Sequence, residues 1–420
     1  MNDLNFHDAQ DGPLLKCQIT NNDDLVEVID LGFQPLGDSL LTEEQLNMPE
    51  TYYPLRLMRS KSLGHSQLDY IVPSSLVYHP EYPYKCGITK EVVDHHRYQA
   101  TRTTNDLNIS KGSLIVDIGS NDGTLLNEFK KLGMRVMGVE PTNIAQIAIS
   151  NGVDTTQSLF NTETCREIVK NHGEASLVTA TNVFAHMSTM GEVIRGIKEV
   201  LSDDGFFVFE NHYMIDILKY NQYDTIYHEH IRNYSLTSII SLFGLYNMKV
   251  IDAEVVERYN GSIRVVVSKN NGLMQSENVK ELLDYEAKFG LFDEKVWKNF
   301  NDSVHKSKSD LLNLLINLKK SGKKVVGNSC PCRASVLMNF CGIGKDLIPY
   351  IAEQPTSAKL GLFLPGKHIP IVNNQILFGE QPDYILLLAW HLATPIMKDL
   401  KSRGIKSKFI IPLPNVEVLD

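Results

Sequence analysis

Residues 114–126, LIVDIGSNDGTLL, decide the fold of this chain. The first five residues are apolar except for Asp117, which predicts a buried parallel strand, and Gly119 to Gly123 form a turn that opens a helix at about Thr124. The two glycines let the backbone come close to a ligand because no Cβ stands in the way. The stretch therefore predicts a strand-turn-helix crossover that binds a nucleotide-like ligand, and an ordinary crossover without a ligand is the alternative.

The chemistry of this turn favours S-adenosylmethionine over a dinucleotide. Its spacing is D-x-G-x-x-x-G rather than G-x-G-x-x-G, and neither Lys nor Arg lies in it to bind a phosphate. A second predicted strand, MRVMGVE, ends in Glu140, about 20 residues after the turn, where an acidic side chain can hydrogen-bond ribose hydroxyls. S-adenosylmethionine is cationic at sulfur and has no pyrophosphate, so it suits an acidic strand end and a turn without basic residues.

Length and composition limit the classes of protein. The chain has 420 residues, of which 43% are hydrophobic, so it can bury more than one core and favours two or three domains. A net charge of -9 argues against nucleic acid and against an anionic membrane surface as partners. The first residues resemble no secretion signal, and no apolar run reaches the roughly 18 residues of a membrane span, so we expect a cytoplasmic protein. Six scattered cysteines do not form a disulfide framework.

The order of predicted elements indicates an α/β fold in three parts. Short apolar runs broken by Pro and Gly predict a small β-rich module over 1–88. Strands and helices alternate over 89–272, which predicts a parallel sheet. The third part, 273–420, begins with a long amphipathic helix or pair and continues as a second α/β domain. In the central part the predicted strands are 114–118, 135–140, 176–180 and 206–210, and the helices are 124 onward, 143–151 and 189–202.

Two segments place histidines where active sites occur. His186 follows the predicted strand 176–180, and open α/β sheets bind ligands at the carboxyl ends of their strands. It faces the same cleft as the glycine turn, although a lone histidine there is often only a loop residue. Residues 227–230 read Tyr-His-Glu-His. Four adjacent polar or titratable side chains are energetically unfavourable unless they serve a functional site. Acid/base chemistry by a histidine beside a carboxylate is favoured over a metal site, because no further ligands are close by in sequence.

Other candidates have two interpretations each. Tyr82 and Tyr84 are two apart and share a face of an extended segment, where they line a site or pack a domain interface. Arg333, at the opening of a predicted helix, and Lys359, after a strand, either hold a phosphate or are solvated surface charges.

Taken together, the motifs resemble those of the sugar C-methyltransferases that act on nucleotide-linked 4-keto deoxysugars. The resemblance covers nearly the full length and implies a three-part plan: an N-terminal zinc-binding module, a central S-adenosylmethionine domain and a C-terminal Rossmann-like domain that helps to hold the nucleotide sugar. It rests on LGFQPLGDSL, EYPYKC, VDIGSNDGTLL, GVEPTN, NVFAHM, YHEHIRNYS, NGSIRVVVS, and SAKLGLFLPGKHIPIV with DYILLLAW.

The resemblance implies a reaction and roles for particular residues. His230 would remove the proton at carbon 3, next to the 4-keto group, with Glu229 and Tyr227 orienting it or the sugar. His186 would stabilise the developing oxyanion, and Tyr84 would line the sugar pocket. The expected cofactor contacts are Asp117, Gly119, Ser120, Asn121, Gly123, Glu140, Pro141, Asn182 and Phe184. The expected substrate contacts are Tyr82, Asn182, Arg264, Arg333 and Lys359.

Two departures from the family pattern carry information. Of two C-x-x-C zinc pairs this chain keeps only Cys17, with Thr20, Ser60 and Leu63 at the other three positions, so we expect no zinc and a module held by packing. The G-Y-G-A-x-x-K turn reads GNSCPCR, in which Arg333 preserves the positive charge. A sugar O-methyltransferase and a non-catalytic S-adenosylmethionine-binding relative are the alternatives. We expect a monomer or a small homo-oligomer.

Overall fold

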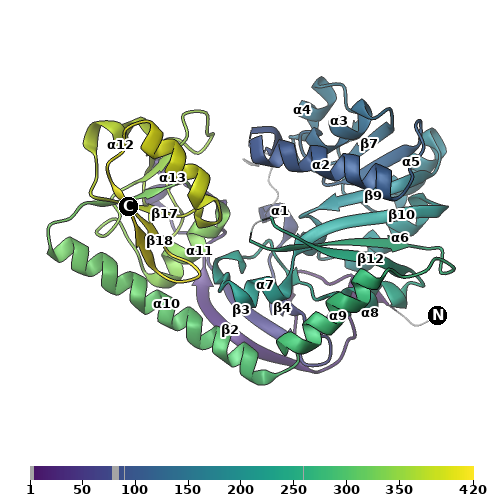
Figure 1. The fold of residues 1–420 in the computed structure, drawn as a ribbon, viewed down its shortest axis with the longest axis horizontal. Coiled ribbons are helices and arrows are strands. Elements are labelled where there is room, and N and C mark those ends of the chain that lie inside the picture. The colour runs from purple at the N-terminus through teal and green to yellow at the C-terminus, as the bar shows by residue number, and fades with distance from the viewer. Residues whose placement is uncertain (1–3, 78–84, 89, 259) are drawn as a thin grey trace.

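The computed structural model describes residues 4–77, 85–88, 90–258 and 260–420 (Figure 1). Strands of the described residues form a seven-stranded, a six-stranded, a four-stranded and a two-stranded sheet. The seven-stranded sheet and the six-stranded sheet lie on opposite sides of Figure 1, and the β-rich N-terminal strands lie below and between them. The α/β class with a β-rich N-terminal module is therefore confirmed.

The seven-stranded central sheet has the order β12-β13-β10-β9-β6-β7-β8. The strand β6 pairs in parallel with β7 and β9, whereas β13 pairs antiparallel with β10 and β12. The predicted strand 114–118 is confirmed in full, and the other three predicted strands are present with shifted ends. The strands are β6 (Leu114–Ile118), β7 (Arg135–Val139), β8 (Thr155–Thr156), β9 (Ala175–Thr181), β10 (Leu201–His212), β12 (Lys249–Val256) and β13 (Ser262–Ser268).

Helices cover both faces of this sheet because the side chains of β6 alternate between two apolar cores. Val116 and Ile118 belong to the larger core, which includes Val193 and Ile197 of α6. Ile115 packs into the second core with residues of α3. The helix α2 was not predicted from the sequence. The helices are α2 (Lys90–Asp106), α3 (Thr124–Lys131), α4 (Ala145–Ser150), α5 (Thr162–His172), α6 (Met190–Val200), α7 (Met214–Lys219) and α8 (Leu236–Leu245).

A strand of the central part completes the sheet of the N-terminal module. The order is β11-β4-β3-β2, and Arg232 of β11 lies opposite Gln67 of β4. The chain therefore runs from the Tyr-His-Glu-His segment directly into the N-terminal sheet. The bounds are β2 (Leu25–Gln34), β3 (Tyr53–Ser60), β4 (Ser66–Leu68) and β11 (Arg232–Asn233), with a separate pair β1 (Gly12–Pro13) and β5 (Tyr70–Ile71) and the short helix α1 (Ser74–Val77).

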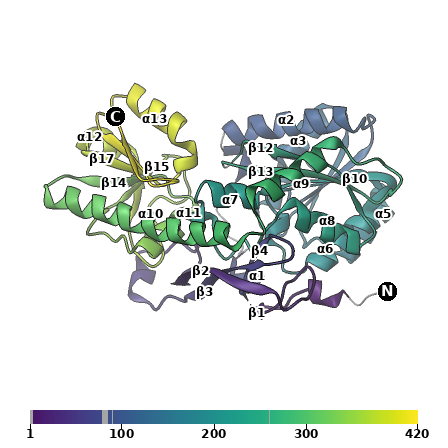
Figure 2. The same cartoon turned by 60° about the horizontal axis from the view of Figure 1, so that its bottom comes forward.

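The C-terminal part begins with the predicted pair of helices. The second helix, α10, buries Trp297, Phe300, Val304 and Leu311 along one face and runs from the N-terminal sheet to the six-stranded sheet (Figures 1 and 2). That sheet has the order β16-β15-β14-β17-β18-β19. The bounds are α9 (Glu277–Phe289), α10 (Glu294–Lys320), β14 (Val325–Asn328), α11 (Cys332–Cys341), β15 (Ile351–Glu353), β16 (Ile371–Asn373), α12 (Gln375–Glu380), β17 (Tyr384–Leu387), α13 (Ala393–Ser402), β18 (Lys408–Ile411) and β19 (Glu417–Leu419).

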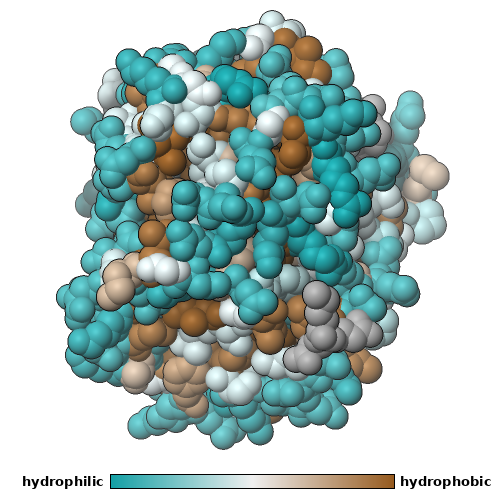
Figure 3. Space-filling model, turned by 90° about the vertical axis from the view of Figure 1, so that its right-hand side faces the viewer, coloured by the Kyte–Doolittle hydropathy of each residue, from teal (hydrophilic) through white to brown (hydrophobic). Residues whose placement is uncertain are grey.

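The surface is mixed in character. Figure 3 shows one face on which hydrophilic residues dominate and hydrophobic ones appear in separate groups between them. No helix among the described residues has both the length and the apolar character needed to cross a membrane.

Candidate active site

The glycine turn after β6 is fixed by the acidic end of β7. The backbone N–H of Gly119 donates to the Val139 carbonyl at 2.8 Å, and that of Asn121 donates to the Glu140 carboxylate at 3.0 Å. Gly119 has a φ of 63°, and a Cβ there would lie 2.7 Å from a methyl group of Val183. The turn and the carboxylate therefore form one unit at the carboxyl edge of the sheet, as the sequence predicts.

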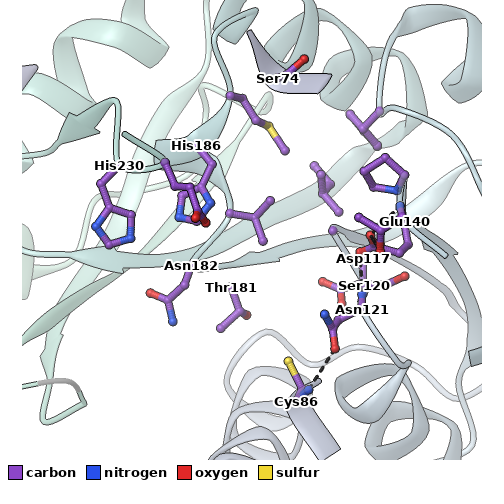
Figure 4. A pocket seen from close by; sticks show the side chains of 18 of the residues that line it. Ser74, Cys86, Asp117, Ser120, Asn121, Glu140, Thr181, Asn182, His186 and His230 are labelled. Carbon is purple, nitrogen blue, oxygen red and sulfur yellow. Dashed lines mark hydrogen bonds between the residues drawn. The ribbon is translucent and has the colours of Figure 1, made fainter. Parts of the chain in front are cut away.

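A cavity of about 570 Å³ opens beside this turn and is lined by all three parts of the chain. In Figure 4, Asp117, Ser120, Asn121 and Glu140 lie on one side of the cavity and His186 and His230 on the other. The central part contributes Asp117, Gly119, Ser120, Asn121, Glu140, Pro141, Asn182, His186, His212, Tyr227, Glu229, His230 and Arg258 to the lining; the N-terminal module contributes Asp38 and Ser74; and the C-terminal part contributes Cys332, Arg333, Lys359 and His391.

Segment 85–88, which precedes α2, contacts the glycine turn. The backbone N–H of Cys86 donates to the side-chain oxygen of Asn121 at 2.9 Å, and that of Gly87 donates to the Asp122 carboxylate at 2.7 Å (Figure 4). Tyr82 and Tyr84 precede this segment and lie outside the described residues.

Burial shifts the protonation of the acidic group inside β6. Asp117 is buried and accepts a hydrogen bond from Thr179 at 2.6 Å. Desolvation raises the pKa of its carboxyl to about 7, and the nearby Glu140 carboxylate adds to this. A cationic ligand at this side of the cavity would favour the ionised form.

Three histidines of the central part meet on the other side of the cavity. The ring centroid of His230 lies 4.9 Å from that of His186 and 4.8 Å from that of His212. The Tyr227 ring lies 4.0 Å from His230. Burial lowers the pKa of His186 to about 4 and that of His212 to about 3, and burial beside these imidazoles holds the pKa of His230 well below 6.5. All three rings are therefore neutral near pH 7.

The tautomer of His230 follows from its hydrogen bond. Its Nδ1 lies 2.7 Å from the backbone carbonyl of Thr225, which can only accept. Nδ1 therefore carries the hydrogen, and Nε2 keeps a lone pair that can take a proton. The group that orients the ring through Nδ1 is thus a backbone carbonyl, whereas the sequence suggested Glu229 or Tyr227 for that role.

Glu229 lies where the three parts of the chain meet. Its carboxylate is 3.7 Å from the Cys332 thiol, and one ligand atom of each of Asp38, Glu229 and Cys332 lies within 4.8 Å of the others. The Lys359 ammonium, however, donates to Asp38 at 3.1 Å and to the Cys330 carbonyl at 2.8 Å. The Lys359 ammonium thus pairs with one of the two carboxylates of this group, and the sequence prediction of no metal stays a prediction.

Arg333 is a buried partner of other protein groups at the edge of the cavity. It donates to Asp224 at 2.9 Å, and its guanidinium lies 4.9 Å from the ring centroid of Trp390. It also lies 3.0 Å from Nδ1 of His391. Arg333 and Lys359 are therefore neither solvated surface charges nor unpaired.

Three of the expected contacts lie away from the cavity lining. Arg264 is buried in ion pairs with Glu210 at 2.6 Å and Glu254 at 2.9 Å. Phe184 is fully buried and stacks on Tyr234 and other rings of the core beneath the cavity. Gly123 has a φ of 77° and caps α3. Each supports the shape of the site through the residues it holds.

The sequence did not single out His212, His391, Arg258 or Cys332. His212 is the last residue of β10, next to β9 in the sheet, so it stands at the same carboxyl edge as Asn182 and His186. The sequence could have indicated His212, because it follows the predicted strand 206–210 closely. The position of His391 in this cavity depends on how the C-terminal part docks, and the sequence has no local sign of it.

Hydrogen bonds and apolar packing hold the turns of the N-terminal module near Cys17 and Ser60. The side chain of Ser60 donates to Asp24 at 2.8 Å, and Ser62 donates to the same carboxylate through its backbone at 3.0 Å. Leu63 and Cys17 are buried apolar contacts. Within residues 4–77 no three Cys, His, Asp or Glu side chains gather closely enough to hold a metal ion, and the expectation of no zinc stays a prediction.

Comparisons with known proteins cover nearly the whole chain. Residues 17–78 match the family "Putative zinc binding domain", residues 93–253 the "Methyltransferase domain", and residues 258–414 the "C-methyltransferase C-terminal domain". The C-methyltransferase NovU of Streptomyces niveus is 32% identical over 412 residues, which is 97% of each chain.

Two solved structures illustrate weaker likenesses. Magnesium protoporphyrin IX methyltransferase of Synechocystis PCC 6803, solved with S-adenosylmethionine, is 12% identical, covers 42% of this chain and 77% of its own, and gives a TM-score of 0.31. The 1,6-didemethyltoxoflavin-N1-methyltransferase of Burkholderia thailandensis is 14% identical, covers 48% of this chain and 94% of its own, and gives a TM-score of 0.34. These scores are too low to carry an argument.

Proposed function

This chain belongs to the C-methyltransferase family and is an S-adenosylmethionine-dependent methyltransferase, and from that premise we propose its substrate and mechanism. The substrate is a nucleotide-linked 4-keto-6-deoxysugar. The methyl group is added to the carbon next to the keto group, carbon 3. The observation that carries this proposal is the hydrogen bond from Nδ1 of His230 to the Thr225 carbonyl, which leaves Nε2 as a base beside the cavity.

Removal of the carbon-bound proton is the first task of the protein. A proton next to a carbonyl is acidic enough for an imidazole to take if the enolate oxygen is stabilised. Nε2 of His230 takes the proton, and the electron pair of the carbon–hydrogen bond moves onto the keto oxygen. Neutral His186, 4.9 Å away between ring centroids, donates a hydrogen bond to that oxygen.

The cofactor turn positions the methyl donor. When bound, S-adenosylmethionine supplies an electrophilic methyl group on a cationic sulfur. Glu140 and the turn Gly119–Ser120–Asn121 hold the ribose and amino acid portions, and the acidic pair Asp117 and Glu140 favours the positive charge. The protein must hold the enolate carbon about 3 to 3.5 Å from the methyl carbon for in-line transfer.

The sugar and its nucleotide occupy the remaining part of the cavity in this proposal. The side-chain oxygen of Asn182 is buried and has no partner among the described residues, so it can accept from a sugar hydroxyl. Lys359 and Arg333 lie at the C-terminal side, where their charges attract a diphosphate even though each is already paired. This orientation would put the cationic sulfur beside the acidic turn and the diphosphate beside Lys359 and Arg333.

Product analysis tests the proposal. The protein is incubated with S-adenosylmethionine and a panel of nucleotide-linked sugars, each as the 4-keto form and as the matched 4-hydroxy form, and products are read by mass spectrometry and carbon NMR. We expect a mass gain of one methylene for a 4-keto sugar only, with the new methyl on carbon 3. Methylation of a 4-hydroxy sugar, or a methyl on oxygen, would overturn the proposal in favour of an O-methyltransferase.

A further inference from the structure

A fully buried arginine lies between the N-terminal module and the loop that carries His186. Arg232 is 0% exposed. Its Nε donates to the Tyr234 hydroxyl at 2.9 Å, and its two terminal nitrogens donate to the side-chain oxygen of Gln18 and to the backbone carbonyl of Met187. No carboxylate in the described parts of the chain lies within 4.0 Å of this guanidinium. A buried cation without a counter-charge is costly, so its retention calls for a role.

Gln18 forms the other half of the contact. Its amide nitrogen donates to the Ser188 carbonyl at 2.8 Å and to the His7 carbonyl at 3.0 Å, while its oxygen accepts from Arg232. Its backbone N–H donates to the side chain of Gln67 at 2.9 Å. Gln18 therefore joins the turn after Cys17 directly to Ser188, and through Arg232 to Met187.

We propose that Gln18 and Arg232 are positioning residues that together fix the loop 186–189, so that the N-terminal module sets the position of His186 in the active site. The inference rests on the proposed function in taking His186 to be an active-site residue. The carbonyls of Met187 and Ser188 lie one and two residues after His186, so displacement of either would move the imidazole directly. Beyond this pair, the Ser188 carbonyl accepts only a 3.3 Å bond from Ala9 among the described backbone contacts.

The arrangement also explains how the module acts without a zinc ligand set. Arg232 stands opposite Gln67 in the strand pair β11–β4, and the Gln67 side chain donates to the Lys16 carbonyl at 3.0 Å. The turn containing Cys17, the strand β4 and the segment that follows His230 are thus joined by one set of hydrogen bonds. The same set fixes both sides of the histidine cluster, since Arg232 is two residues after His230.

The charge of Arg232 adds an electrostatic effect on His186. Burial, as the larger cause, and the Arg232 guanidinium together lower the pKa of this imidazole to about 4. Among the described residues, His212 and His230 also face His186, and both have lowered pKa values. At neutral pH, His186 is an uncharged imidazole that still carries one N–H. It can donate this hydrogen in a hydrogen bond to an enolate oxygen, and no proton has to pass from His186 to His230 beforehand.

Two substitutions of Arg232 separate the effect of its charge from the effect of the two hydrogen bonds that its terminal nitrogens donate. Arg232→Met removes both, whereas Arg232→Lys keeps the charge but cannot reach two partners in a plane. Gln18→Met removes the contacts to the loop and leaves the arginine. Asn301→Ala is the matched control, because Asn301 donates to the Val28 carbonyl of the same module far from the loop.

The experiment measures three quantities. They are the pKa of the His186 imidazole, by NMR titration of histidine-labelled protein; the affinity for S-adenosylmethionine, by calorimetry; and the kcat of methyl transfer. We expect all three Gln18 and Arg232 variants to lose about 10- to 100-fold in kcat, the cost of a misplaced catalytic group, with cofactor affinity within twofold. Only Arg232→Met should raise the titration midpoint of His186, and Asn301→Ala should change nothing.

An unchanged His186 midpoint in Arg232→Met, or wild-type kcat in Gln18→Met, would overturn the inference. If Arg232→Met fails to fold, Gln18→Met and Arg232→Lys carry the test. The titration needs no sugar substrate, so it remains decisive if the proposed substrate class is wrong.

Discussion

The two sides of the cavity are built in different ways from the same sheet edge. The cofactor side uses residues close in sequence, with the turn after β6 bonded to the end of β7. The reaction side brings together His212 from the end of β10, His186 and His230 from two connections of the central part, and His391 from a connection of the C-terminal part. The first side bears acidic groups, whereas the second combines neutral imidazoles with buried cations that are paired with carboxylates.

The largest expected effect belongs to the reaction side. His230→Asn should lower the rate of methyl transfer by roughly 10²- to 10⁴-fold, since it removes the group that takes the proton, while cofactor affinity stays near wild type. Deuterium uptake at carbon 3 of a 4-keto sugar, with the demethylated cofactor bound, should also disappear. His186→Ala should slow exchange and transfer but leave some of each.

His228→Gln is the matched control for this prediction. His228 is two residues away, packs with its ring centroid 6.0 Å from that of Tyr53 and lies outside the lining of the main cavity. Its rate should stay within about threefold of wild type, because it lacks access to the reacting carbon. If the His230 variant exchanges deuterium and transfers the methyl group at the wild-type rates, His230 is not the base and the assignment of its side of the cavity to the reaction is wrong.

A smaller effect is expected on the cofactor side. Glu140→Gln removes the charge that accepts from the backbone N–H groups of Asn121 and Thr142, at 3.0 and 2.9 Å. The affinity for S-adenosylmethionine should fall about tenfold by calorimetry, or about 1.4 kcal/mol, with little change in kcat at saturation. Glu199→Gln, at an exposed ion pair on α6, is the control. A fall in kcat alone would assign Glu140 to the reaction side.

The sequence predicted the first side well and the second only in part. The turn and Glu140 were readable because backbone geometry and strand ends impose local patterns, and Asn182 and His186 followed from the same rule. His391 was missed because its place depends on docking between distant parts of the chain. Arg264 and Arg333 were chosen for their charge, but the partners that bury them, Glu210 and Asp224, come from elsewhere in the sequence. A sequence shows which side chains are charged, but it does not show which oppositely charged side chains they contact in the fold.

The histidine cluster also predicts how stability depends on pH. An imidazole with a folded pKa below its unfolded value of 6.5 stabilises the protein above pH 6.5, and this contribution is lost as pH falls towards the folded pKa. The pKa is about 4 for His65, His186 and His228, and about 3 for His96 and His212. Burial raises the pKa of Asp117 to about 7 and of Asp216 to about 6, which opposes the trend, but among the described residues fewer carboxyl pKa values are raised than histidine pKa values are lowered.

We therefore expect the melting temperature to fall between pH 6.5 and pH 4.5. Each histidine contributes about 1.4 kcal/mol per pH unit in this window. His228→Gln should make the dependence shallower by about that amount, as measured by urea unfolding at several pH values. A flat profile from pH 7 to pH 5 would show that these rings are protonated or exposed in the folded protein.

The smallest expected effect concerns metal in the N-terminal module, the part of the chain that supports the two sides of the cavity. The sequence resemblance implies four zinc-ligand positions, of which three carry Thr20, Ser60 and Leu63 in this chain. In the structure the Asp24 carboxylate accepts from Ser60 at 2.8 Å and from the Ser62 hydroxyl at 2.7 Å.

Elemental analysis of the purified protein should accordingly find well under one zinc per chain, and a strong chelator should leave the melting temperature and methyl transfer unchanged. Asp24→Asn supplies the positive counterpart, since it weakens the bonds from both serines and should cost about 1 kcal/mol of folding free energy. A stoichiometric zinc that resists dialysis would instead mean that other ligands, such as His65 or Cys86, bind it. In that case the module would depend on a metal, and the contacts of Gln18 and Arg232 would support the active site only in its presence.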